Sequence, residues 1–478
     1  MMKKEVFRME NVVGDETDIT NLDNMNFHMN KGEILGLIPV NGCGRENLLR
    51  LLCRNRPIRL GRIYVGEKLV NSHMYSDNSL NQVYLLEQKS KLISELTVLD
   101  NIYVLQKMHR KFFYNRTQVR KQFRWLCESM KVNIRPDVNA YKLAPLERII
   151  VEIMKGIEQG AKLIVMSGIG ECISFSHLNL LKNIMVDLAK QGMSFLYFCS
   201  NYEEIIDSCD RILFMQDGRD LKLFERNEFN RRWLQKMIYS FPDISATPRH
   251  NTSRVIFEVK GLRTIRRESK NLIMRAGQCL VLYDKNRVID SLLKLKDMLP
   301  CKMWLEGEQM SFGKMQKVLG TQVMLLAPDP TKSMIYKEFT FIENLCLGLG
   351  KKVHEQIVSE RVLESVKEEY REFLGECIDE KDVSALDIFD LYKLIYYRIH
   401  LLNPSLAIIF NPFKNTDINL RGHIVELILR LKEKGITLIV VSVDINASML
   451  VADTIGIIET EGLTEVHEAK DFGFINTL

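Results

Sequence analysis

The chain repeats itself, and this repeat limits its possible folds more than any other feature of the sequence. Four segments of the first half recur in the second half in the same order, about 240 to 246 residues later: 82–86 and 322–326, 95–102 and 338–345, 162–166 and 406–410, 195–199 and 438–442. Chance similarity between apolar strands could explain one such match but not an ordered series. The repeat therefore predicts two copies of one domain.

Each copy alternates short apolar segments with longer amphipathic ones. Helical periodicity is clear in residues 177–190 and again in residues 424–434. This alternation predicts an α/β fold in which each domain has a mainly parallel sheet covered by helices. We expect the first domain at residues 1–238, a polar, proline-containing linker at 239–253, and the second domain at 254–478.

Composition excludes several classes of protein. The net charge of +5 is small for 478 residues, so no nucleic-acid partner is expected. Ten cysteines without a C-x-x-C pair favour reduced thiols in a cytoplasmic protein. Residues 1–6 lack the apolar core of a signal peptide, so none is expected, and no run reaches the roughly 20 apolar residues that span a bilayer. If the chain works at the inner face of the membrane, another chain must hold it there.

Residues 36–52 carry the chemically most informative pattern. An apolar run up to Pro39 predicts a buried strand, a glycine-containing loop follows, and leucines at helical spacing predict a helix. Backbone N–H groups and the helix dipole converge in such a loop, which is the geometry that binds phosphate. The candidate nucleotide-binding residues of this loop are Asn41, Gly42, Cys43, Gly44, Arg45, Glu46 and Asn47.

The loop differs from the P-loop pattern G-x-x-x-x-G-K-[ST] in both residues that act on phosphate and metal. Residues 39–46 are P-V-N-G-C-G-R-E, so Arg45 replaces the lysine and Glu46 replaces the hydroxyl residue. Arginine keeps the positive charge but is longer and planar. A glutamate puts a carboxylate next to the phosphates where a neutral hydroxyl normally binds Mg²⁺.

With its repeat, this chain resembles the ATP-binding-cassette (ABC) family, and more narrowly the tandem ATPase subunit of bacterial ribose- and galactose-type importers, in a degenerate form. The resemblance covers nearly the full length. It implies two tandem P-loop NTPase-like domains, each with a helical subdomain. It also implies a Q-loop glutamine, a glycine-rich signature, a Walker B segment ending in D-E, a D-loop and a switch histidine in each domain.

In the first copy, Gln88 matches the Q-loop glutamine and joins the candidate nucleotide-binding residues. A solvated loop glutamine is the alternative for that residue. At four other motifs of the family, this chain has residues that differ from the family's. They are Leu143–Glu147 at the signature, Ser167 and Gly168 at Walker B, Glu171 at the D-loop, and Ser200 at the switch.

The second copy departs further from the family. Its loop, residues 277–292, has no glycine after Gly277. β-Branched Val288 and Ile289 occupy the turn, which makes a close approach of phosphate sterically poor. The signature segment 386–390 has lost both glycines, and Walker B ends in Asn411-Pro412 instead of two carboxylates. Pro412 and the D-loop residue Asp417 still match the family.

These substitutions predict that neither site hydrolyses ATP, because the ligands of Mg²⁺ and the group that orients water are missing. We therefore expect no catalytic residues, no metal ligands and no bound Mg²⁺. ATP remains the candidate ligand of the first loop. The alternative is that this loop binds no ligand and is only a turn that joins the strand to the helix. Cys43 is either a small filler residue or, at a helix N-terminus, a redox-sensitive thiol.

The leading functional hypothesis is a pseudo-ATPase that acts as a docking or regulatory partner of a membrane permease or sensor. The resemblance implies that residues 99–141 contact that partner, and this region is rich in basic and aromatic residues. Assembly with other subunits or self-association would follow. The enzyme alternative is an active ATPase subunit that energises sugar import. A ribosome-associated tandem cassette ranks last, because its long charged helical linker is absent.

Overall fold

The computed structural model describes residues 4–14, 22–76, 80–103, 116–199, 202–229, 254–263, 269–284, 286–287, 289, 302–353, 358–459 and 462–469. It divides into two compact units, Met1–Tyr239 and Ser240–Leu478. The expected linker, residues 239–253, and the switch position Ser200 lie outside the described residues. The domain boundaries expected from the sequence stay predictions.

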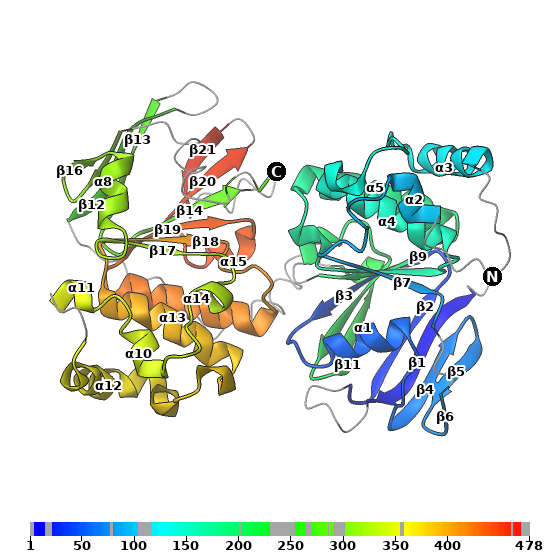
Figure 1. The fold of residues 1–478 in the computed structure, drawn as a ribbon, viewed down its shortest axis with the longest axis horizontal. Helices are drawn as coiled ribbons and strands as arrows, with labels where there is room; N and C mark the ends of the chain where they lie inside the picture. Colours follow the sequence, from blue (N-terminus) through cyan, green and yellow to red (C-terminus); the bar gives the residue numbers. More distant parts are fainter. Residues whose placement is uncertain are drawn as a thin grey trace. The chain divides into compact units, whose positions relative to one another are not determined.

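Unit 1 contains two sheets (Figure 1). The antiparallel one has the strand order β2-β1-β4-β5-β6: Met25–Asn30, Glu5–Val13, Leu60–Val65, Lys68–Ser72 and Tyr75–Ser76. The mainly parallel one has the order β11-β10-β3-β9-β8-β7: Arg219–Glu225, Arg211–Gln216, Ile34–Pro39, Ser194–Phe198, Leu163–Ser167 and Val83–Glu87. Only the pairing of β10 with β11 is antiparallel in this second sheet, among the described strands.

The helices of unit 1 form two layers. Helix α1 (Arg45–Cys53) packs between the two sheets, because its buried leucines share one apolar core with strands of both. The remaining helices gather away from the antiparallel sheet (Figure 1): α2 (Val98–Tyr103), α3 (Arg116–Met130), α4 (Pro145–Glu158) and α5 (Phe175–Lys190). Short 3₁₀ turns follow several elements: Ala140–Lys142 (η1), Ile169–Glu171 (η2), Tyr202–Glu204 (η3) and Arg226–Glu228 (η4).

Unit 2 has the same two kinds of sheet. The antiparallel order is β13-β12-β15-β16: Ser269–Arg275, Val255–Arg263, Lys302–Leu305 and Glu308–Met310. The mainly parallel order is β21-β20-β14-β19-β18-β17: Gly462–Glu468, Thr454–Glu459, Cys279–Asp284, Thr437–Ser442, Leu406–Phe410 and Val323–Leu326.

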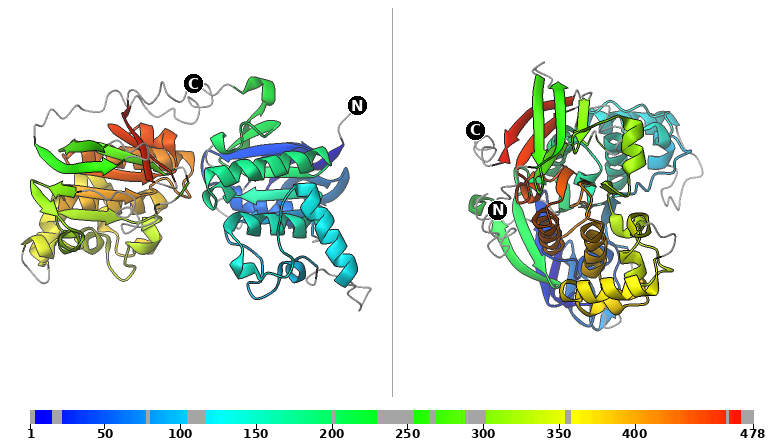
Figure 2. Two further views of the ribbon diagram at one scale, coloured as in Figure 1. Left: turned by 90° about the horizontal axis from the view of Figure 1, so that it is seen from above. Right: turned by 90° about the vertical axis from the view of Figure 1, so that its left-hand side faces the viewer.

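The described helices of unit 2 are α8 (Phe312–Val318), α9 (Pro330–Ser333), α10 (Phe341–Leu345), α11 (Gly350–Val353), α12 (Glu360–Leu374), α13 (Ile388–Leu402), α14 (Ile418–Glu433) and α15 (Ile445–Met449). The 3₁₀ turns are Gly375–Asp379 (η5) and Val383–Ala385 (η6). Helices α10, α12 and α13 lie together at one end of the unit (Figures 1 and 2). We call this group the helical subdomain of unit 2.

The two parallel sheets have the same strand order. Counted from the edge strand that pairs antiparallel with its neighbour, the order β11-β10-β3-β9-β8-β7 corresponds to β21-β20-β14-β19-β18-β17. The repeated segments of the sequence fall on equivalent elements of the two units: β7 and β17, α2 and α10, β8 and β18, β9 and β19. The predicted fold class, two tandem α/β domains of one kind, is confirmed.

Candidate functional site

Residues 40–44 connect the buried strand β3 to helix α1 in unit 1. Gly44 precedes the helix with a φ of 75°, in the left-handed region. A Cβ atom at this position would lie 2.8 Å from both the Gly218 Cα atom and the Met215 Cε atom. Glycine is therefore required here for both its conformation and its size. The expected strand, glycine loop and helix follow one another.

The first half of this loop is attached to the β10–β11 turn. The Val40 N–H donates to the Met215 carbonyl at 2.8 Å. The Asn41 side chain donates to Asp217 Oδ1 at 2.6 Å and accepts from the Asp217 N–H at 3.1 Å. Asn41 thus fixes the loop position rather than pointing into the loop. Gly42 is exposed, whereas Cys43 and Asn47 are half-buried.

Arg45 turns across the end of the sheet. Its guanidinium donates to the Ser167 hydroxyl at 2.8 Å, and Ser167 ends strand β8. The Arg45 Nε atom is buried and has no hydrogen-bond partner in the described part of the chain. The residues at the lysine position and at the Walker B aspartate position are therefore bonded to each other, and one guanidinium N–H group stays available for an acceptor.

Glu46 points away from this arrangement. Its side chain is 76% exposed, and its nearest cation is Arg50, one turn along the helix at 4.0 Å. At that distance and exposure the pair contributes little to stability. Glu46 therefore supplies no oxygen toward the place where a metal would lie between loop and Walker B.

Gln88 follows strand β7 and reaches the same end of the sheet. Its amide Nε2 donates to the Glu171 carboxylate at 2.9 Å. Glu171 belongs to the 3₁₀ turn η2 directly after Ser167 and Gly168. The structure thus brings the predicted residues Arg45 and Gln88 to one site, with Gln88 exposed and engaged by a carboxylate.

Glu204 is a site residue that sequence reasoning missed. Its Oε2 atom accepts from the Tyr197 hydroxyl at 3.1 Å, and it lies only 1.9 Å from where a Cβ atom of Gly170 would be. Burial, then the charge of Glu204, raises the pKa of Tyr197 well above its usual range, so that tyrosine stays a hydrogen-bond donor. The available signal was a glutamate pair shortly after a buried strand, near the switch position.

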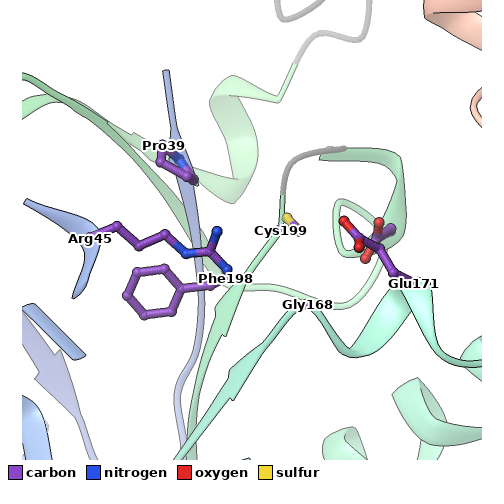
Figure 3. A pocket seen from close by; sticks show the side chains of 7 residues that line it. Pro39, Arg45, Gly168, Glu171, Phe198 and Cys199 are labelled. Carbon is purple, nitrogen blue, oxygen red and sulfur yellow. The ribbon is translucent and has the colours of Figure 1, made fainter. Parts of the chain in front are cut away.

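These residues enclose a small pocket at the ends of β3, β8 and β9, with room for about 10 Å³, close to that of one water molecule. Figure 3 shows Arg45 reaching past Phe198 from one side and Glu171 on the other. The lining residues are Pro39, Arg45, Gly168, Glu171, Phe198, Cys199 and Glu204. The charged groups that line the pocket are the two carboxylates of Glu171 and Glu204 and the guanidinium of Arg45.

Both signature helices carry their own carboxylates at the N-terminus. In unit 1, Pro145 is the first residue of α4 and Glu147 accepts from the Ala144 N–H at 2.8 Å. In unit 2, Asp387 caps α13 by accepting from the Asp390 N–H at 2.9 Å. A side-chain carboxylate at a helix N-terminus satisfies the free N–H groups and the dipole that a phosphate would otherwise use.

The second loop holds an internal carboxylate. Asp284, which ends β14 and is 1% exposed, accepts from the Ile289 N–H at 2.6 Å. By position in the repeat, Asp284 corresponds to Pro39 and Ile289 to Gly44. The loop amide is thus bonded to this protein's own carboxylate. Val288, also expected to fill the turn, lies outside the described residues.

Two other motif residues of unit 2, Asn411 and Asp417, make hydrogen bonds within the fold. Asn411 follows β18 with a φ of 43°, and its N–H donates to the Val441 carbonyl at 2.7 Å. Asp417, which matches the D-loop, caps α14 by accepting from the Leu420 N–H at 2.8 Å.

Comparison with known proteins gives the context of this site. The ABC transporter family model matches residues 22–166. The chain is 23% identical to the ribose import ATP-binding protein RbsA of Caldanaerobacter subterraneus, over 98% of this chain and 96% of that protein. It is 22% identical to the xylose import ATP-binding protein XylG of Geobacillus kaustophilus, over 98% and 97% of the two chains.

Among solved structures, an ATP-binding cassette of an ABC transporter in its ADP conformation matches with 21% identity and a TM-score of 0.41, covering 47% of this chain and 92% of that one. Within the part of the chain that the structure describes, no helix combines the length and apolar character needed to cross a membrane. From the matched domain, the repeated fold and the full-length similarity, the chain is built of two tandem ABC-type cassettes and resembles the ATP-binding subunits of bacterial sugar importers.

Proposed function

We propose that this protein is a pseudo-ATPase of the ABC type that acts as a docking or regulatory partner of a membrane permease or sensor, at the inner face of the cell membrane. The observation that carries the proposal is the hydrogen bond from Arg45 to Ser167. In a working cassette these two positions hold the γ-phosphate and the metal. Here the two side chains satisfy each other.

The first loop fits a phosphate better than it fits a metal. Gly44, in the left-handed region, lets the backbone approach a phosphate closely, and the Nε of Arg45, which has no partner among the described residues, offers a hydrogen-bond donor. Mg²⁺ would neutralise the terminal phosphates and needs oxygen ligands. Glu46 faces solvent, and the Ser167 hydroxyl already accepts a hydrogen bond from Arg45. We infer that ATP, if bound, is held through phosphate without a protein-ligated Mg²⁺.

The docking role is supported by a feature that both copies retain. In unit 1, buried Asn101 bonds to both backbone groups of Ile93 and to the carbonyls of Leu96 and Thr97. In unit 2, buried Asn344 bonds in the same way to Tyr336, Phe339 and Thr340. This arrangement, which we call the asparagine staple, fixes the backbone beside an exposed large side chain in each copy: Ile93 in unit 1 and Tyr336 in unit 2.

The partner region expected at residues 99–141 is described in part. Residues 104–115, with His109 and three of its aromatic residues, lie outside the described residues. Of the others, Tyr103 is buried and belongs to the core, whereas Trp125 and Tyr141 are exposed. Tyr141, which lies outside α3, is an exposed aromatic residue of the kind that anchors a protein interface.

An active ATPase subunit for sugar import is the second candidate function. It is favoured by the names of the full-length relatives, which are ribose and xylose import ATP-binding proteins. The two candidates share the docking surface and differ in turnover, so an ATP hydrolysis assay separates them.

Titration with a fluorescent ATP analogue is expected to give the same Kd in Mg²⁺ and in EDTA. We expect Arg45→Ala to weaken binding about tenfold, because it removes a charge-assisted hydrogen bond to phosphate. Arg50→Ala, on the exposed side of the same helix, is the matched control and should leave the Kd unchanged. Binding that tightens strongly with Mg²⁺ would show that a metal site has been retained.

The docking role predicts that the chain sediments with inverted membrane vesicles from its native host but not with protein-free vesicles of the same lipids. Replacing Ile93 and Tyr336 together by aspartate should abolish this sedimentation, because buried charge opposes an apolar contact. The control is Tyr75→Asp, at an equally exposed tyrosine on strand β6. Equal binding of the double variant and the unaltered chain would refute the docking surface.

A further inference from the structure

Helices α3 and α12 are equivalent elements of the two units. Each has 15 residues, follows the staple helix (α2 or α10) and precedes the signature helix. Two of the three buried positions in each helix also correspond: Leu126 and Met130 in α3 occupy the positions of Tyr370 and Leu374 in α12. The two helices therefore present equivalent outer faces.

The outer faces carry opposite charge at equivalent positions. Arginines stand at 120 and 124 in α3, and glutamates stand at the equivalent positions 364 and 368 in α12. Spacing of four residues places each set on one helix face. Helix α3 contains four basic residues and one acidic residue, whereas α12 contains five acidic and three basic ones. An outer face is thus basic in unit 1 and acidic in unit 2.

Local ion pairs accentuate this difference in α12. Lys367 and Arg371 each lie 2.7 Å from the carboxylate of Asp379, in the turn η5. The two cations share this one carboxylate, which offsets part of their charge, and the exposed Glu368, Glu369 and Glu372 supply negative charge on the outer face.

In α3, Arg120 is paired with Asp137 at 2.6 Å. Lys121 and Arg124 are exposed, and neither makes an ion pair within the described residues. An apolar residue accompanies each charged face: Trp125 is 61% exposed beside Lys121, and Phe373 is 46% exposed beside Glu369. A charged rim around an exposed aromatic residue is the composition of a protein interface.

We propose that α3 of one copy of this chain binds α12 of a second copy. The two surfaces match because they are equivalent helices of equal length with opposite charge and one aromatic anchor each. A single chain carries both surfaces, so copies of this one chain supply both partners of the contact. The ligand is a second copy, and the proposal does not depend on nucleotide binding or hydrolysis.

The test is sedimentation velocity of the full chain over a range of concentrations. We expect self-association at about 50 mM NaCl that weakens at least about tenfold at about 500 mM NaCl, because exposed charges are then screened. The reversal variants K121E/R124E and E368K/E372K should each lose association. An equimolar mixture of the two variants should regain it, because each variant then supplies the face that the other needs.

The control is R62E/K68E, which lowers the net charge as much as K121E/R124E does, at exposed positions of β4 and β5. It should associate like the unaltered chain, and thermal melting checks that every variant is folded. A monomer under all conditions overturns the proposal, as do reversal variants that still associate alone or a mixture that stays monomeric. In the last case the charged faces are docking sites for other proteins.

Discussion

Phosphate release from MgATP by the purified chain is expected to be at least about 10³-fold slower than by a competent ABC cassette. Hydrolysis needs a metal bridging the phosphates and a group that orients water. At the Walker B positions Ser167 is bonded to Arg45, and Gly168 has no side chain. The loss corresponds to about 4 kcal/mol of transition-state stabilisation, at 1.36 kcal/mol for each tenfold in rate.

Three carboxylates elsewhere in the fold indicate that no other group supplies the missing transition-state stabilisation. The Glu147 carboxylate caps the signature helix of unit 1, and Asp387 caps that of unit 2. The buried Asp284 carboxylate bonds the amide of Ile289 in the second loop. Each places negative charge where a nucleotide would bring more, and at the buried Asp284 this charge interacts strongly because little water screens it.

The control for this assay is Arg45→Ala. If the residual turnover comes from a contaminant, the variant and the unaltered chain release phosphate at the same rate. Turnover close to that of a working cassette, reduced about a hundredfold or more by Arg45→Ala, would support the active sugar-import subunit instead.

Replacing Arg211 by methionine is expected to destabilise unit 1 by about 3–5 kcal/mol. Arg211 on β10 forms an ion pair with Glu33, and these side chains are 7% and 2% exposed. Its guanidinium also donates to the His28 carbonyl at 2.8 Å. Methionine leaves the Glu33 carboxylate buried without its cation, and this uncompensated charge is the main cost.

The measurement is thermal unfolding followed by circular dichroism, in which the transition of unit 1 should fall by about 10 °C or more. Glu33 directly precedes β3, so the variant also loosens the strand that positions the loop at Asn41–Gly44. Adding Glu33→Gln to Arg211→Met should recover part of the loss, because the buried charge is then removed.

The matched control is Arg219→Met on the neighbouring strand β11. Arg219 pairs with Asp23 in a largely exposed position. Exposed pairs contribute about 0–1 kcal/mol, so this variant should unfold nearly like the unaltered chain. Equal destabilisation by the two arginine substitutions would contradict the role assigned to burial.

The sequence by itself determined the fold of this protein. The ordered repeat predicted two copies, and the alternation of apolar and amphipathic segments predicted their α/β character. Strands β7, β8 and β9 and helix α5 are found where the patterns placed them. These features depend on local periodicity, because a buried strand or an amphipathic helix needs a regular spacing of apolar residues.

Only the tertiary structure decided what the side chains of the site do. Arg45 and Ser167 are 122 residues apart in sequence, and no local pattern shows that they bond. Glu204 reaches the pocket because η3 follows β9 at the end of the sheet where the loop also lies. Such contacts depend on which strand ends meet, and a hydrogen bond depends on the direction of each side chain. The residue types predicted a phosphate loop that lacks its usual lysine and hydroxyl residue. The fold decided which side chains lie beside this loop.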